Sequence, residues 1–122
     1  MEAYEKLQFI KMYDPDAAAR LERLLGKKDN LKEGNAYGER FTERQFQLVV
    51  LPLLDILHQR ARILEALNQG TNTIPVISER LGIDKDIVFD HLKELMRKTL
   101  VEIKGHRERH AIFSVSRPLR DY

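Results

Sequence analysis

Residues 75–98 contain two helical patterns separated by a single glycine, and this arrangement limits the possible folds more than any other part of the chain. The first pattern, "PVISERL", covers about two turns. The second, "DKDIVFDHLKEL", places Val88, Leu92 and Leu95 on one side of a helix. Gly82 lies between the two patterns, and glycine readily adopts the left-handed conformation that ends a helix. The sequence therefore predicts two helices joined by a tight turn, with Asp84 capping the second helix, which runs to about residue 98.

A β-hairpin is predicted directly after this helix pair. Apolar residues alternate at Val101 and Ile103, and again at Ala111, Phe113 and Val115. The polar segment "KGHRERH" between them is typical of a flexible connection. A helical run over 58–69 and a short extended piece at 73–74, before Pro75, precede the helix pair. The expected fold class is mainly α with a small β-hairpin.

The order of these elements, together with several short motifs, resembles a winged helix-turn-helix domain. Residues 58–115 are similar to the DNA-binding core of the ArsR and MarR families of transcription regulators. The matching positions are Leu81-Gly82-Ile83, Val88, His91, Leu92, Leu100-Val101, Gly105, Arg107, Phe113 and Val115. The sequence departs from the family pattern at Thr99, where glycine is frequent, and at the acidic positions Asp84, Asp86 and Asp90.

The resemblance implies sequence-specific binding of double-stranded DNA by a homodimeric transcriptional regulator. Helix 84–98 would enter the major groove, and the wing would contact flanking backbone or minor groove. A homodimer would place its two recognition helices about one turn of DNA apart, on a palindromic site. The candidate DNA-binding residues are Lys85, Phe89, Asp90, Lys93, Arg97, Lys104, His106, Arg107 and Arg109.

Helical periodicity indicates which side of helix 84–98 is exposed. Asp86, Asp90, Lys93 and Arg97 lie opposite the apolar stripe, with Phe89 at its flank. Asp86 is explained by the helix dipole, because it lies in the first turn. Asp90 either is offset by Lys93 or accepts a hydrogen bond from a cytosine amino group. Phe89 either contacts a thymine methyl or packs on a neighbouring segment, whereas His91 is expected to support packing.

A second hypothesis follows from the same acidic residues. The domain could be a winged-helix protein-interaction module in which the acidic end of helix 84–98 contacts a basic partner. Winged helices serve both uses, so the fold does not decide between them.

The N-terminal part is expected to be a helical extension. Helices are predicted over 2–13, with Tyr4 on its apolar side, and over 14–25, with Asp14 as N-cap and Gly26 just past its end. A loop at 27–40 and a helix over 41–57 follow, and Pro52 should kink or restart that helix. Because segment 46–57 is apolar almost all round, we expect cover on more than one side, with a second copy supplying part of it. The predicted domains are 1–57 for dimerisation, 58–116 for the winged helix and 117–122 for a basic tail.

Composition excludes several classes of function. The 122 residues include no cysteine, which removes disulfides and thiolate chemistry and fits a cytoplasmic protein. The N-terminus lacks a signal-peptide pattern, and no apolar run approaches the roughly 20 residues of a membrane span. Residues 97–120 hold seven Lys/Arg against two Glu. Arginines beside His106, Glu108 and His110 disfavour a metal site there. No motif indicates an enzyme or a cofactor.

Overall fold

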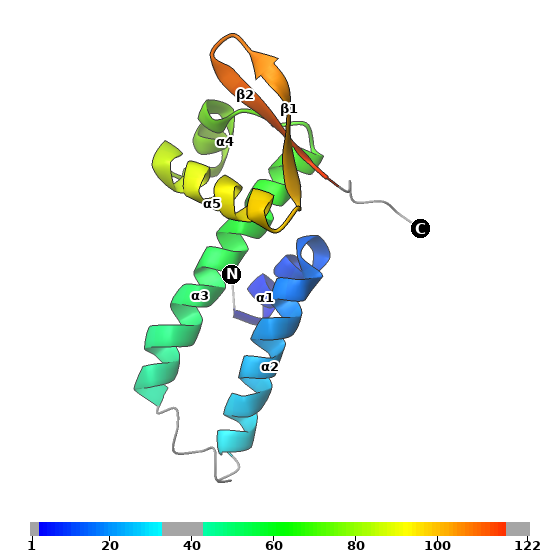
Figure 1. Ribbon diagram of the computed structural model, residues 1–122. Helices are drawn as coiled ribbons and strands as arrows, with labels where there is room; N and C mark the ends of the chain where they lie inside the picture. Colours follow the sequence, from blue (N-terminus) through cyan, green and yellow to red (C-terminus); the bar gives the residue numbers. More distant parts are fainter. Residues whose placement is uncertain (1–2, 33–42, 117–122) are drawn as a thin grey trace. The chain divides into compact units, whose positions relative to one another are not determined.

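The computed structural model describes residues 3–32 and 43–116, which form five helices and one antiparallel sheet (Figure 1). The elements are α1 (Ala3–Tyr13), α2 (Pro15–Lys32), α3 (Glu43–Asn68), α4 (Ile74–Leu81), α5 (Lys85–Arg97), β1 (Val101–Arg107) and β2 (His110–Val115). The chain divides into two compact units, residues 1–59 and residues 60–122, and α3 contributes to both. The fold is mainly helical with a small two-stranded sheet, as expected.

In the first unit, Asp14 connects α1 to α2. Its backbone N–H donates to the Ile10 carbonyl at 2.7 Å, and its Oδ1 accepts from the Ala17 N–H at 3.3 Å, so the predicted cap is confirmed. Leu7 and Ile10 of α1 are buried, as are Ala17, Ala18 and Leu21 of α2.

The sequence predicted that this helix ends before Gly26, but α2 continues to Lys32. A helix interior accepts glycine at a cost of about 1 kcal/mol relative to alanine, so one glycine is a weak stop signal. The predicted loop therefore loses its first residues to α2, and its remainder lies outside the described residues.

Helix α3 is continuous from Glu43 to Asn68, with Pro52 inside it. The predicted restart at Pro52 is wrong, because the loss of a single backbone donor does not outweigh the other bonds of a 26-residue helix. Within residues 1–59, Val50 and Leu54 are buried. The Lys6–Asp55 ion pair, at 2.6 Å, and the edge-on contact of the Phe9 and His58 rings, at 5.3 Å between centroids, join α1 to α3.

The opposite side of α3 in this unit is apolar and uncovered. The exposed apolar residues are Leu48, Val49, Leu51, Leu53 and Ile56. Among the described residues, one side of this segment is therefore covered, and the predicted cover by a second copy stays a prediction.

In the second unit, Gly82 ends α4 in the left-handed conformation (φ 68°), and its N–H donates to the Ser78 carbonyl at 2.9 Å. The Ser78 hydroxyl donates to the carbonyl of Ile83, which fixes the turn into α5. The predicted pair of helices joined at Gly82 is confirmed. Two details differ: Ile74 is already helical, and Asp84 precedes α5 without a side-chain capping bond.

The core of this unit is formed by the second half of α3, by α4 and α5, and by the base of the hairpin. Its buried apolar residues are Ala61, Ile63, Leu64, Ala66, Leu67, Ile77, Ile83, Val88, Leu92, Leu95, Val101 and Phe113. The stripe predicted for α5 is buried in full.

The hairpin is longer and tighter than the sequence predicted. Strand pairing extends to Arg107 opposite His110, so only Glu108 and Arg109 form the turn, with Glu108 at φ 56°. A β-bulge falls between Ile103 and Gly105, which leaves Lys104 as the extra residue of β1. The polar segment 104–110 was predicted to be a flexible connection, but most of it is paired, because exposed antiparallel strands also carry polar side chains. Below, residues 104–110 are called the hairpin tip.

Candidate nucleic-acid interface

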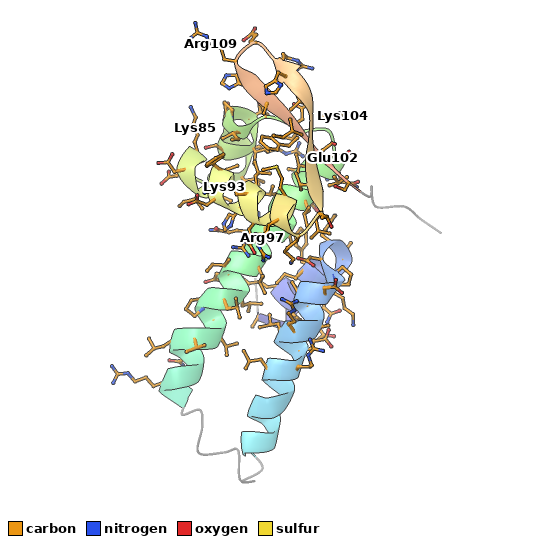
Figure 2. The ribbon with its side chains drawn as sticks, in the orientation of Figure 1. Lys85, Lys93, Arg97, Glu102, Lys104 and Arg109 are labelled. Carbon is orange, nitrogen blue, oxygen red and sulfur yellow. The ribbon has the colours of Figure 1, made fainter. Side chains whose placement is uncertain are left out.

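The exposed face of α5 carries all the candidate residues that the sequence assigned to this helix. They are Lys85, Phe89, Asp90, Lys93 and Arg97, and each is exposed. Figure 2 shows Lys85, Lys93 and Arg97 spaced along the helix. The i, i+4, i+7 spacing of Val88, Leu92 and Leu95 determines this face, because these side chains lie buried in the core on the opposite side of the helix.

Lys93 is the centre of a small cluster on this face. Its Nζ lies 3.4 Å from Asp90 Oδ1 and 5.0 Å from the centre of the Phe89 ring. The ion pair offsets the charge of Asp90, as the i,i+3 spacing predicted. Phe89 remains 46% exposed, and its ring lies beside the charged end of Lys93 rather than in the core.

Arg97 is likewise engaged by an acid on its own helix. Its Nε lies 3.1 Å from both carboxylate oxygens of Glu94, and its Nη2 also contacts Glu94 Oε1. This hydrogen bonding lowers the pKa of Glu94 and raises the pKa of Arg97. Glu94 was missed as a residue of the interface, although its i,i+3 spacing from Arg97 is a recognisable pairing signal.

The hairpin tip differs from α5 in how its basic side chains are paired. Lys104, His106, Arg107, Arg109 and His110 are all exposed. Within the part of the chain that the structure describes, none of these five side chains forms an ion pair. Figure 2 shows Arg109 at the far end of the hairpin. The tip therefore presents positive charge to solvent that no acid among the described residues offsets by direct contact.

Backbone geometry holds these side chains on a short ribbon. The bulge at Lys104 changes the twist and direction of β1 at the start of the tip. On β2, the Phe113 N–H donates to the Asn72 carbonyl at 2.8 Å, so the base of the hairpin is fixed to the segment before α4. The anchored base and the exposed tip suit contact with an extended polyanion.

His91 supports α5 from behind, as expected. It is buried, and its Nδ1 accepts a hydrogen bond from Arg60 Nε at 3.1 Å. Burial, reinforced by the Arg60 charge, lowers the pKa of His91, and Asp90 opposes this shift. The neutral imidazole is the form that accepts this bond.

Two exposed apolar side chains were not among the candidate DNA-binding residues that the sequence indicated. Val76 of α4 is 49% exposed and Ile87 of α5 is 41% exposed. A shallow depression at the start of α5 is lined by Ser78, Asp84, Lys85, Asp86 and Ile87. A single sequence does not distinguish these residues from buried ones, because exposed apolar residues are common on protein surfaces.

The remaining findings concern a metal site, a membrane span, the basic tail and similar proteins. In residues 3–32 and 43–116, no cluster of His, Asp or Glu has the geometry of a metal site. Among the helices described, none is long and apolar enough to cross a membrane. The arginines at 117 and 120 lie outside the described residues. Comparisons with protein-family models, curated proteins and solved structures find no significant match to this chain.

Proposed function

We propose that this chain is a cytoplasmic, sequence-specific binder of double-stranded DNA that acts as a transcriptional regulator. In this proposal α5 enters the major groove, and the hairpin tip contacts the flanking backbone or minor groove. The resemblance to winged helix-turn-helix regulators supports it. The order of α4, the turn at Gly82, α5 and an antiparallel hairpin is consistent with that fold.

The observation that carries the proposal is the contrast between paired and unpaired cations. On α5, Lys93 and Arg97 each have an acidic partner, whereas Lys85 forms no ion pair within the described residues. At the hairpin tip, Lys104, Arg107 and Arg109 are exposed without one, within the described residues. Unpaired, exposed Lys and Arg are the groups that displace counterions from DNA phosphates. We therefore assign most of the affinity to the hairpin tip.

The exposed face of α5 suits a role in selectivity. Phe89 offers an aromatic edge for a thymine methyl, and Asp90 offers an acceptor for a cytosine amino group. Lys93 contacts both residues, so it positions them as well as offsetting the acid. Removal of Phe89 should change the preferred sequence more than the total affinity.

A protein-interaction module remains the second candidate, and one observation favours it. Asp84, Asp86 and Asp90 are all exposed on or just before α5. An acidic helix end of this kind repels phosphate and attracts a basic partner surface. In that case the hairpin tip would have little affinity for DNA.

Selection from a random-sequence duplex pool distinguishes the two functions. Full-length protein is mixed with the pool at low salt, and bound duplexes are recovered and sequenced over several rounds. A DNA-binding regulator enriches a defined motif, and Phe89→Ala alters that motif. Recovery of duplex no better than with an Arg107→Ala, Arg109→Ala double variant would contradict the proposal and favour the interaction module.

A further inference from the structure

Helix α3 carries an exposed stripe whose ends have opposite charge. Its residues are Arg44, Leu48, Leu51 and Asp55, at the helical spacing i, i+4, i+7 and i+11. At about 100° per residue they fall within an arc of about 60°. Leu48 is 64% exposed, Leu51 37%, and both charged residues are exposed. These four residues are called the α3 stripe below.

The α3 stripe is complementary to itself in one orientation. If two copies pair antiparallel about an axis between Leu48 and Leu51, Arg44 of each copy lies level with Asp55 of the other. Leu48 then lies level with the second copy's Leu51. A parallel pair would instead place Arg44 beside Arg44 and Asp55 beside Asp55. The charge order therefore selects the antiparallel arrangement, which a two-fold axis perpendicular to the two helices produces.

A cavity next to the α3 stripe offers space in which the leucines of a second copy's stripe can pack. It measures about 210 Å³ and is lined by Ala3, Tyr4, Leu7, Leu21, Val50, Leu51 and Leu54. Tyr4 is 71% exposed at this site although the sequence placed it on the apolar side of α1. Leu51 belongs both to the stripe and to the cavity wall. In the antiparallel pair, Leu48 of the second copy lies level with Leu51 and is therefore in position to enter the cavity.

Asp55 retains capacity for a second cation. Its Oδ1 accepts from Lys6 Nζ at 2.6 Å, yet its side chain is 60% exposed, against 25% for Lys6. A carboxylate accepts bonds on two oxygens. Asp55 would then lie between Lys6 of its own copy and Arg44 of the second copy.

From these observations we infer that the α3 stripe is the contact surface for a second copy of this chain, paired antiparallel. The occupant is a second copy rather than a small apolar molecule, because a small molecule would leave Leu48, Arg44 and Asp55 without a role. The inference concerns residues 1–59 alone and holds whether or not residues 60–116 bind DNA.

The test measures the mass of the full chain without DNA by light scattering at about 50 µM, where a micromolar contact is formed. We expect twice 14.3 kDa for the natural sequence. Arg44→Glu alone or Asp55→Arg alone should weaken self-association about tenfold or more, because each creates two like-charge contacts. The control Arg23→Glu, on the exposed side of α2, should leave the dimer unchanged.

Two restored arrangements make the test specific. An equimolar mixture of the Arg44→Glu and Asp55→Arg proteins should form a heterodimer, since both contacts between positions 44 and 55 of the two copies are again between opposite charges. The double variant R44E/D55R should recover the homodimer. Restoration also shows that the single variants are folded, which circular dichroism checks independently.

Three results would overturn the inference. One is a monomer for the natural sequence at about 50 µM. Another is a dimer that neither charge reversal weakens. The third is a dimer that Val49→Glu dissociates while Leu48→Glu does not, because Val49 lies on a different side of α3 and such a dimer would use that side.

Discussion

Arg60 of α3 donates a hydrogen bond from Nε to Nδ1 of His91, at 3.1 Å, and so joins the second half of α3 to α5. The bond requires a neutral imidazole, because a protonated His91 has no lone pair at Nδ1 and would face the Arg60 guanidinium as a like charge. Attachment of the candidate recognition helix to its support is therefore coupled to the protonation of one buried histidine.

Stability should fall as pH decreases below about 6.5, the ordinary histidine pKa. Folding lowers the pKa of His91, so its contribution is present above the unfolded-state pKa and is lost as pH falls towards the folded-state pKa. We expect His91→Gln, which keeps an acceptor but does not titrate, to have a shallower decline between pH 7.5 and 5.5 in thermal unfolding. The control is His110→Gln at the exposed start of β2. An unchanged decline in His91→Gln would contradict this role.

Thr99→Gly should stabilise the protein. Thr99 has φ 61°, a left-handed conformation that strains a β-branched residue by about 1–2 kcal/mol. Glycine removes that strain at some cost in unfolded-state entropy, so we expect a gain of about 1 kcal/mol in chemical denaturation.

The opposite change at Gly82, which also has a left-handed backbone conformation, is the matched comparison. Gly82→Ala places a Cβ at φ 68°, in open space, so the expected loss of about 1 kcal/mol comes from backbone strain alone. If Thr99→Gly were destabilising, Thr99 would have to contribute more through its own contacts than its backbone costs.

Glu94→Gln should tighten binding to duplexes of mixed sequence. The change removes a negative charge from the exposed face of α5 and releases Arg97 from its ion pair. One additional phosphate contact is expected to raise affinity a few-fold at low salt. The control Glu22→Gln also frees a lysine, Lys11, but lies on α2. Affinity for duplex is measured by fluorescence anisotropy. Equal changes in affinity for the two variants would show that α5 contributes no more to binding than α2 does.

Arg107→Ala and Arg109→Ala should each weaken binding to all sequences alike. Both side chains lie at the hairpin tip, where contact with backbone phosphate gives affinity without sequence preference. Each variant should make the salt dependence shallower by about one unit of log–log slope, whereas Arg23→Ala on α2 should not. If the order of preferred sequences changes instead, the tip reads bases or groove shape.

Much of residues 60–116 was predictable because its signals are local. Gly82 marks the turn, and the spacing of Val88, Leu92 and Leu95 determines the buried side of α5. The alternation at Ala111 and Phe113 indicates the second strand of the hairpin. These features depend on backbone geometry and periodicity, which neighbouring residues encode directly.

The helix ends and strand lengths that the sequence did not reveal depend on competition between weak effects. Gly26 and Pro52 read as interruptions, yet both are helical, because the hydrogen bonds of a long helix outweigh one unfavourable residue. The length of β1 and β2 was underestimated because strand pairing extends through polar residues. In the candidate site, the exposed face of α5 was predictable, but the engagement of Arg97 by Glu94 depends on side-chain geometry.

The salt dependence of binding tests the central claim, that this chain binds duplex DNA mainly through exposed cations. Full-length protein is titrated with a labelled mixed-sequence duplex at several salt concentrations. For about six phosphate contacts we predict a slope of roughly −5 in log K against log salt. Absence of binding at low salt, or a slope near zero, would contradict the account.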